Sequence, residues 1–142
     1  MHDRIIVATV ALIVLVGAAS VIAFSLPNAA GMPHVSITSI LTDKDTYFSK
    51  EKMQISIGIT SSSPLDNVQM KVEGIQDRYG QMRLSEIRNL TLQEGQNSIV
   101  VDYTMPVCSA CAGLKSGVYL INVTVSREGV PLAVASHSIS IA

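Results

Sequence analysis

An uncharged apolar run near the start of the chain restricts what its N-terminal part can fold into. Residues 5–26, IIVATVALIVLVGAASVIAFSL, contain no ionisable side chain, and only Thr9, Ser20 and Ser25 are polar. As an α-helix this segment would measure about 33 Å, close to the roughly 30 Å of a bilayer's hydrocarbon core. It is apolar on all sides, unlike a helix that lies in the membrane surface. The run therefore predicts a transmembrane helix over residues 5–26, which Pro27 would end.

Two interpretations of this run differ in the mature N-terminus. As a signal anchor, residues 1–4 are a cytoplasmic tail, because Arg4 and the terminal amine lie on that flank. As a cleaved signal peptide, Val21 and Ala23 would occupy positions −3 and −1, and the mature chain would start near Phe24. The run is longer than the 7–15 residues of a signal-peptide core, which favours the anchor. Both interpretations place the rest of the chain outside the cytoplasm, and the anchor predicts a single-pass cell-membrane protein with an extracytoplasmic C-terminal domain.

A change of hydrophobic period marks the second part of the chain. Residues 27–34 form a short linker, and apolar and polar residues alternate from residue 35 onward, as in half-buried strands. Turn signals such as Tyr79-Gly80 and Glu128-Gly129 separate these runs. We expect an all-β domain over residues 35–142, an antiparallel sandwich with strands near 35–41, 53–60, 66–75, 80–91, 96–104, 117–126 and 130–141. The last run alternates less cleanly, which predicts a bulge near Ala135 or Ser136.

Two short motifs resemble those of a known class of domain. Gly117-Val118-Tyr119, at the start of the penultimate strand, resembles the tyrosine corner of immunoglobulin-like sandwiches. The segment Thr42–Tyr47, followed by Glu51, is similar to the opening of macroglobulin-type surface domains. The resemblance implies an immunoglobulin-like module of an archaeal or bacterial cell envelope, used for adhesion, assembly or spacing. No Trp, no inter-sheet disulfide and no thioester motif accompany these residues, so no protease-trapping activity is implied.

The two cysteines, Cys108 and Cys111, lie together between two predicted strands. Residues three apart in a β-turn are close enough for a disulfide, and an oxidising compartment favours that pairing. A thioredoxin-like redox pair would need a helix after the first cysteine, and Gly113 and Gly117 argue against one. Half of a metal site completed by a second chain is the third interpretation. A local disulfide is the prediction.

Two tripeptides match the N-glycosylation acceptor pattern, beginning at Asn89 and at Asn122. In each strand the Asn and Thr lie on the face opposite the apolar residues, so we expect both sites to face solvent. A polar strand face that matches the tripeptide by chance is an equally good interpretation.

The remaining polar residues do not form a recognisable catalytic or metal-binding pattern. His137 stands alone in the last strand and is expected to be structural. Asp43, Asp45 and Glu51 could offer oxygen ligands to calcium, but turn formation is the more common role of such residues. A net charge of −1 with mixed signs gives no footprint for nucleic acid. We therefore expect no enzyme, no cofactor and no metal.

These features together predict a membrane-anchored extracytoplasmic module with a structural or partner-binding role. Its partners would be the lipid bilayer, through residues 5–26, and other cell-envelope proteins, with the oligomeric state left open. One alternative is a filament subunit, because archaeal pilins and archaellins have a similar outline, although the basic residue-Gly processing site is missing. Anchored sandwich components of the archaeal motility machine also have this outline. A second alternative is an extracytoplasmic thiol-disulfide protein that uses Cys108 and Cys111.

Overall fold

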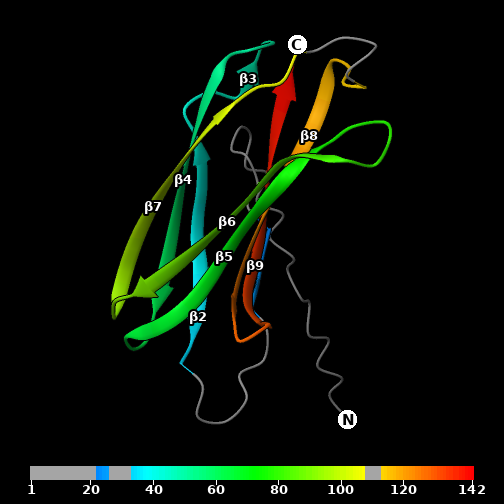
Figure 1. The fold of residues 1–142 in the computed structure, drawn as a ribbon. Coiled ribbons are helices and arrows are strands. Elements are labelled where there is room, and N and C mark those ends of the chain that lie inside the picture. Colours follow the sequence, from blue (N-terminus) through cyan, green and yellow to red (C-terminus); the bar gives the residue numbers. More distant parts are fainter. Residues whose placement is uncertain (1–21, 26–32, 108–112) are drawn as a thin grey trace, which may run out of the picture.

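The computed structural model describes residues 22–25, 33–107 and 113–142, which form two β-sheets packed face to face (Figure 1). The larger sheet has the strand order β1-β9-β8-β5-β6, with β3 beside β9, and the smaller has the order β2-β4-β7. The strands are β1 Ile22–Ser25, β2 Val35–Thr42, β3 Thr46–Tyr47, β4 Lys52–Ser61, β5 Leu65–Gln76, β6 Met82–Leu92, β7 Gly95–Thr104, β8 Gly117–Arg127 and β9 Val130–Ile141. The predicted all-β sandwich and its seven strands are confirmed.

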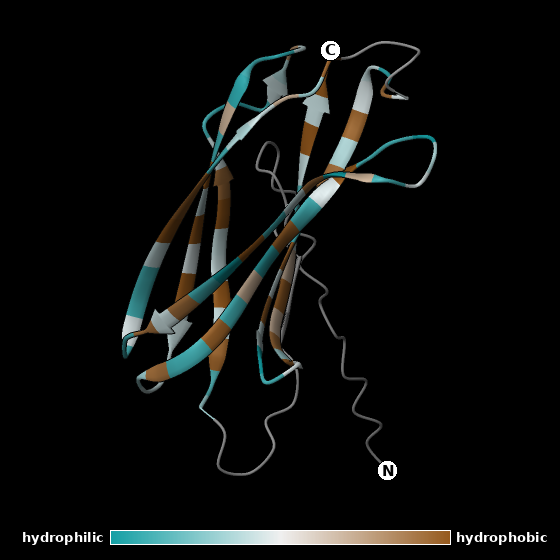
Figure 2. Ribbon diagram, viewed as in Figure 1, coloured by the Kyte–Doolittle hydropathy of each residue, from teal (hydrophilic) through white to brown (hydrophobic). Residues whose placement is uncertain are grey.

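The alternating sequence pattern becomes the inner and outer faces of the two sheets. Apolar and polar residues alternate along the strands in Figure 2, because successive side chains of a strand point to opposite faces. Met53 on β4 and Met70 on β5 are almost completely buried. The largest fully buried side chains come from both sheets and include Tyr47, Ile40, Met53, Ile55, Ile57, Ile59, Met70, Ile75, Leu84, Leu92 and Ile121. One continuous apolar core therefore holds the sandwich together.

The end of the predicted transmembrane segment differs in the structure. Residues 22–25 form strand β1, which runs antiparallel to β9 and pairs Ile22 with Ser136 and Ser25 with Ala133. The prediction of a helix over residues 5–26 is therefore wrong for residues 22–25. The rest of the predicted span lies outside the described residues. Across the part of the chain that the structure describes, no helix is both long and apolar enough to cross a membrane.

The irregularity in β9 lies at a different place from the one predicted. The register with β8 shifts where Val125 pairs with Ala133 and Ser126 pairs with Pro131, so Leu132 is the extra residue. From Ala133 to Ile141 every second side chain is buried without interruption. The bulge predicted near Ala135 or Ser136 is therefore wrong, because the change of face is already complete at Leu132.

Additional contacts lie along two edges of the sandwich. On one side, β1 pairs with the middle of β9, and β3 pairs in parallel with its end, Tyr47 opposite Ile141. On the other side, the guanidinium of Arg88 on β6 donates a hydrogen bond of 2.7 Å to the carbonyl of Val100 on β7. Short edge strands and charged side chains on edge strands hinder unwanted strand pairing between molecules.

Candidate functional site

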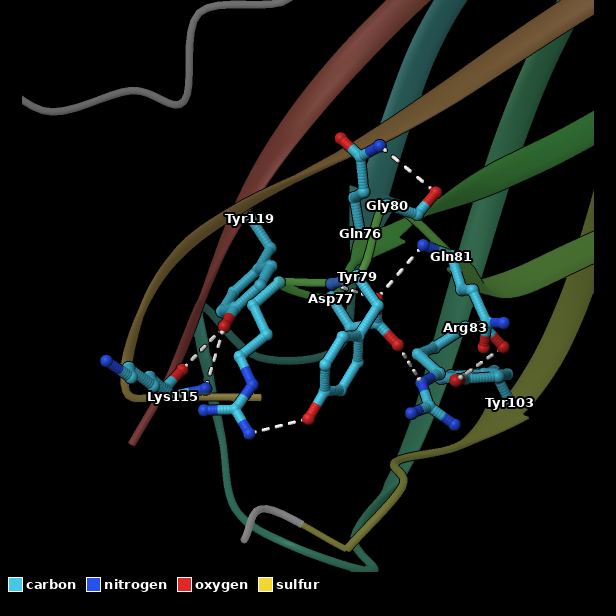
Figure 3. Close-up of polar contacts among 10 residues, drawn as sticks. Gln76, Asp77, Tyr79, Gly80, Gln81, Arg83, Tyr103, Lys115 and Tyr119 are labelled. Atoms are coloured by element: carbon cyan, nitrogen blue, oxygen red, sulfur yellow. Dashed lines mark hydrogen bonds and ion pairs between the residues drawn. The ribbon is translucent and has the colours of Figure 1, made fainter. Parts of the chain in front are cut away.

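One end of the sandwich brings together the turn at Tyr79-Gly80, the tyrosine Tyr119 and the start of strand β8. The turn between β5 and β6 is built around Asp77, whose side chain is fully buried. One of its carboxylate oxygens accepts hydrogen bonds from the amides of Tyr79 at 2.8 Å and Gln81 at 3.0 Å, and the other accepts one from Arg83 Nε at 2.9 Å (Figure 3). The sequence signalled this turn only through Tyr79-Gly80. The role of Asp77 was missed because its partners come together only in the folded hairpin.

The charge on Asp77 is stabilised by these contacts. Burial raises the pKa of the carboxyl, but hydrogen bonds from the amides of Gln81 and Tyr79, together with the Arg83 guanidinium, outweigh it, so the pKa lies below its usual value. The carbonyl of Arg83 in turn accepts a hydrogen bond of 3.0 Å from the hydroxyl of Tyr103 on β7, in the opposite sheet. The turn is therefore tied to both sheets.

The tip of the turn presents an arginine and a tyrosine to solvent. The guanidinium of Arg78 lies 4.8 Å from the ring centroid of Tyr79 and donates a hydrogen bond of 2.6 Å to its hydroxyl. The ring of Tyr79 also packs on Gly113, where a β-carbon would lie 2.8 Å from the ring. The Arg78 amide donates to the Gly113 carbonyl at 3.0 Å. These contacts hold an exposed aromatic ring and a cation in a fixed place.

The tyrosine corner expected from the sequence is present. The hydroxyl of Tyr119 on β8 donates to the carbonyl of Lys115 at 2.7 Å and accepts from the amide of Lys115 at 3.1 Å (Figure 3). A tyrosine near the start of the penultimate strand thus bonds back to upstream backbone, as in immunoglobulin-like domains.

Beside the corner, the larger sheet divides and leaves a groove on its outer face. Strand β5 pairs with β8 only as far as Gly74 and Ile121, and Ile75 then takes a positive φ of 55° that redirects the strand. Among the described residues, β8 residues 117–120 have no strand partner on the side facing β5. The groove there is lined by Gly74, Gln76, Met82, Val118, Tyr119, Leu120 and Asn122. Val118 and Leu120, two residues apart on the same face of β8, are 73% and 56% exposed, so two apolar side chains face solvent side by side at this groove.

The acidic segment that could have offered calcium ligands is a turn. The carboxylate of Asp43 accepts hydrogen bonds from the Gln54 amide and the buried Tyr47 hydroxyl, both at 2.7 Å. These two bonds lower the pKa of Asp43, while burial and the bond to Asp43 raise the pKa of Tyr47 to about 12. The carboxylate of Glu51 forms an ion pair with Lys44 and accepts a hydrogen bond from the Phe48 amide. No group of three or more His, Cys, Asp or Glu side chains in the described ranges could hold a metal ion.

His137 is buried between the sheets. Its Nε2 lies 3.2 Å from the Thr42 hydroxyl, and its Nδ1 has no hydrogen-bond partner among the described residues. Burial lowers its pKa, opposed by the charge of Asp45. The ring is therefore held neutral, in keeping with the structural role expected of it.

The two glycosylation candidates lie in different surroundings. Asn89 is exposed on the edge strand β6. Asn122 is half-buried in β8, where its side-chain oxygen accepts a hydrogen bond of 2.6 Å from Ser136. Asn89 is therefore the more accessible acceptor. Cys108 and Cys111 lie outside the described residues, so their disulfide stays a prediction.

Comparison with known proteins points to the fold. No protein-family model matches the chain, and no curated protein matches it. Among solved structures, the CARDB domain of PF1109 from Pyrococcus furiosus superposes with a TM-score of 0.56 at 14% identity, covering 77% of this chain and 94% of that one. The C-terminal domain of wzt superposes with a TM-score of 0.58 at 13% identity, covering 86% and 78%.

A third similar structure shows that this fold also occurs inside an enzyme. The alkylpurine DNA glycosylase AlkC of Pseudomonas fluorescens, solved bound to DNA containing an abasic site analogue, matches with a TM-score of 0.57 at 15% identity, covering 76% of this chain but 30% of that one. At such identities the likeness concerns fold alone. The described residues from Val35 onward form an immunoglobulin-like β-sandwich.

Proposed function

We propose that the chain is a membrane-anchored, extracytoplasmic module of the cell surface with a structural or partner-binding role and no catalytic activity. The observation that supports this most directly is the joining of an uncharged apolar run to an immunoglobulin-like sandwich. Three carboxylates of the sandwich, Asp43, Asp77 and Glu51, accept hydrogen bonds from backbone amides in turns. Carboxylates used in this way are not available as general acids or bases.

The groove beside the tyrosine corner is the surface best suited to a protein partner. Val118 and Leu120 project from the outer face of β8, and the neighbouring backbone of residues 117–120 lacks a strand partner on one side among the described residues. An extended segment of another envelope protein could add to such an edge, with apolar pockets supplying specificity.

Membrane attachment is tested with the full chain in its native host. We expect it to stay in the membrane fraction after alkaline carbonate washing and to be released by detergent. Protease added to intact cells should digest the sandwich. Release by carbonate, or a sandwich protected until the cells are broken, would contradict the anchor or its orientation.

The partner-binding surface is tested by pull-down from solubilised envelopes with the full chain as bait. The double variant Val118→Asp, Leu120→Asp should lose most of the bound partner while keeping its thermal stability, because both side chains are exposed. Val100→Asp, at a 42% exposed position on the other sheet, is the matched control and should retain the partner. Equal recovery of the partner by both variants would show that this groove is not the binding surface.

A further inference from the structure

A cavity lies at the end of the sandwich opposite the tyrosine corner, where β2, β5 and β9 begin and β8 ends (Figure 1). Its volume is about 200 Å³, and its walls are formed by Pro33, Leu65, Arg127, Glu128, Val130 and Leu132. The wall at Pro33 is held in place by the next residue, because the amide of His34 donates a hydrogen bond of 2.8 Å to the Ser62 hydroxyl. The cavity therefore belongs to the folded sandwich and is separate from the groove at the other end.

The cavity adjoins two irregular segments, one on each side of β8. Strand β5 pairs with β8 only from Val68, opposite Arg127, and Asn67 just before it has a positive φ of 56°. On the other side of β8, Leu132 is the extra residue of the bulge in β9. Both neighbours of β8 thus leave regular pairing at its end, and each contributes a leucine to the cavity wall, Leu65 from β5 and Leu132 from β9.

Arg127 brings an unpaired cation to this cavity. The side chains of Ile121, Val123 and Val125 are fully buried on one face of β8, and strand alternation places Arg127 on the same face. Its Nε is buried and has no hydrogen-bond partner within the described ranges, and none of the ion pairs found there includes it. A guanidinium stays charged, and burying a polar atom without a partner costs free energy. A ligand that accepts a hydrogen bond from Nε would remove this cost.

The other walls define the rest of the ligand. Leu65 is almost completely buried and Val130 is 48% exposed, so apolar surface extends from the core to the rim of the cavity. Such surface favours a hydrocarbon tail, while a guanidinium matches the two oxygens of a carboxylate. Glu128 is the second charged residue of the wall and is exposed. Its negative charge would repel a second carboxylate on the ligand.

We propose that this cavity binds a small monocarboxylate with a short apolar tail. The carboxylate pairs with the Arg127 guanidinium, and the tail lies along Leu65, Val130 and Leu132. The site goes beyond the role proposed above and does not depend on the membrane anchor, because no residue before Pro33 forms part of its wall.

Binding is measured by equilibrium dialysis of radiolabelled hexanoate against the full-length protein in phosphatidylcholine discs, with empty discs as the blank. We expect saturation at one molecule per chain. Acetate keeps the carboxylate but has almost no tail, so it should bind at least about tenfold more weakly. Hexanol keeps the tail but has no charge, and it should displace no hexanoate.

The position of the ligand is measured by NMR on protein labelled with 15N-arginine. Hexanoate should shift the Nε–H signal that is missing from the spectrum of Arg127→Gln and leave the signals of the other arginines in place. No shift of the Arg127 signal, or an equal shift of another arginine, would place the ligand elsewhere and overturn the proposal.

Four variants test the roles of single residues, and thermal melting checks that each is folded. Arg127→Gln should weaken hexanoate binding at least about tenfold. Arg78→Gln removes an exposed arginine at the opposite end, so it is the matched control and should bind normally. Val130→Ser should weaken hexanoate binding about threefold and leave acetate binding unchanged. Glu128→Gln should tighten hexanoate binding about twofold, because a like charge is removed.

Each part of the proposal can fail separately. Equal losses in Arg127→Gln and Arg78→Gln would attribute binding to net charge and overturn the site. Acetate that binds as tightly as hexanoate, or a Val130→Ser protein that binds hexanoate normally, would overturn the apolar half of the site. An absence of any gain in Glu128→Gln would overturn the selection for a single negative charge. Val130 and Glu128 are exposed, so these two tests remain open even if Arg127→Gln does not fold.

Discussion

Gly74 on β5 and Leu120 on β8 approach so closely that a β-carbon on Gly74 would lie 2.3 Å from the Leu120 carbonyl oxygen. The obstacle is main chain, which cannot rotate away as a side chain can. This contact is also the last point at which β5 and β8 pair. It therefore fixes where the sheet divides and where the groove begins.

Gly74→Ala should destabilise the protein by about 2–3 kcal/mol, because the two strands must separate to admit a methyl group. Gly58→Ala is the matched control, since its added carbon would meet the side-chain atoms Ser39 Oγ, Thr38 Oγ1 and Gln96 Nε2. These can rotate, so we expect a loss under about 1 kcal/mol. Denaturant unfolding measures both values, and equal losses would contradict the backbone clash.

Tyr119→Phe removes the hydroxyl that binds both polar backbone groups of Lys115. We expect a loss of about 1 kcal/mol in the free energy of unfolding, the usual net value of a hydrogen-bonded hydroxyl. Tyr79→Phe, at an exposed tyrosine, should change stability by less than about 0.5 kcal/mol. A stable Tyr119→Phe protein would show that the corner does not hold the start of β8.

The stability of the sandwich should depend on pH through His137. Its pKa is lowered in the folded state, chiefly by burial, from 6.5. As the pH falls, His137 is therefore protonated in the unfolded chain before it is protonated in the folded protein. The free energy of unfolding is at its full value above pH 6.5 and decreases as the pH falls from 6.5 to the lowered pKa of His137. The melting temperature should be constant between about pH 8 and pH 7 and fall as the pH is lowered from about 6.5 to 5. In His137→Gln this fall should be smaller, and an identical fall would exclude His137 as the cause.

A substitution in the two-residue turn between β8 and β9 should stabilise the protein. Glu128 and Gly129 have φ values of 51° and 77°, as in a type I′ turn, for which Asn-Gly is the preferred pair. Glu128→Asn should therefore raise the free energy of unfolding by about 0.5 kcal/mol. Glu94→Asn, also before a glycine and also removing one charge, is the control. Glu94 does not have a positive φ, and no gain is expected. A gain of equal size in both variants would point to charge rather than turn geometry.

Strands that are half-buried could be predicted from sequence because burial imposes a period of two on the residues. This applies to β4, whose Met53, Ile55, Ile57 and Ile59 are all buried. The two-residue strand β3 has no such signal, since it exists only through pairing with the end of β9. Strand β1 was missed because an apolar edge strand inside a long apolar run has the same composition as a lipid-facing helix.

The candidate site was predictable in part. Tyr119 follows Gly117 in a short motif whose hydrogen bonds are local, so its role could be inferred from the sequence. Asp77 gave only a turn signal, because its burial depends on Arg83 and on the opposite sheet through Tyr103. The groove results from the close approach of Gly74 to Leu120, a contact between strands 46 residues apart in sequence.

The pairing of β1 with β9 changes what removal of a leader peptide would mean for this chain. Cleavage between Ala23 and Phe24, the position that the −3 and −1 residues suggest, would cut through the middle of β1. The mature product would lose the partners of Ser136 and Ala135 and expose their backbone at the rim of the sheet. Such a product would be prone to pair with other molecules, so a processed form should self-associate where the uncut form remains monodisperse.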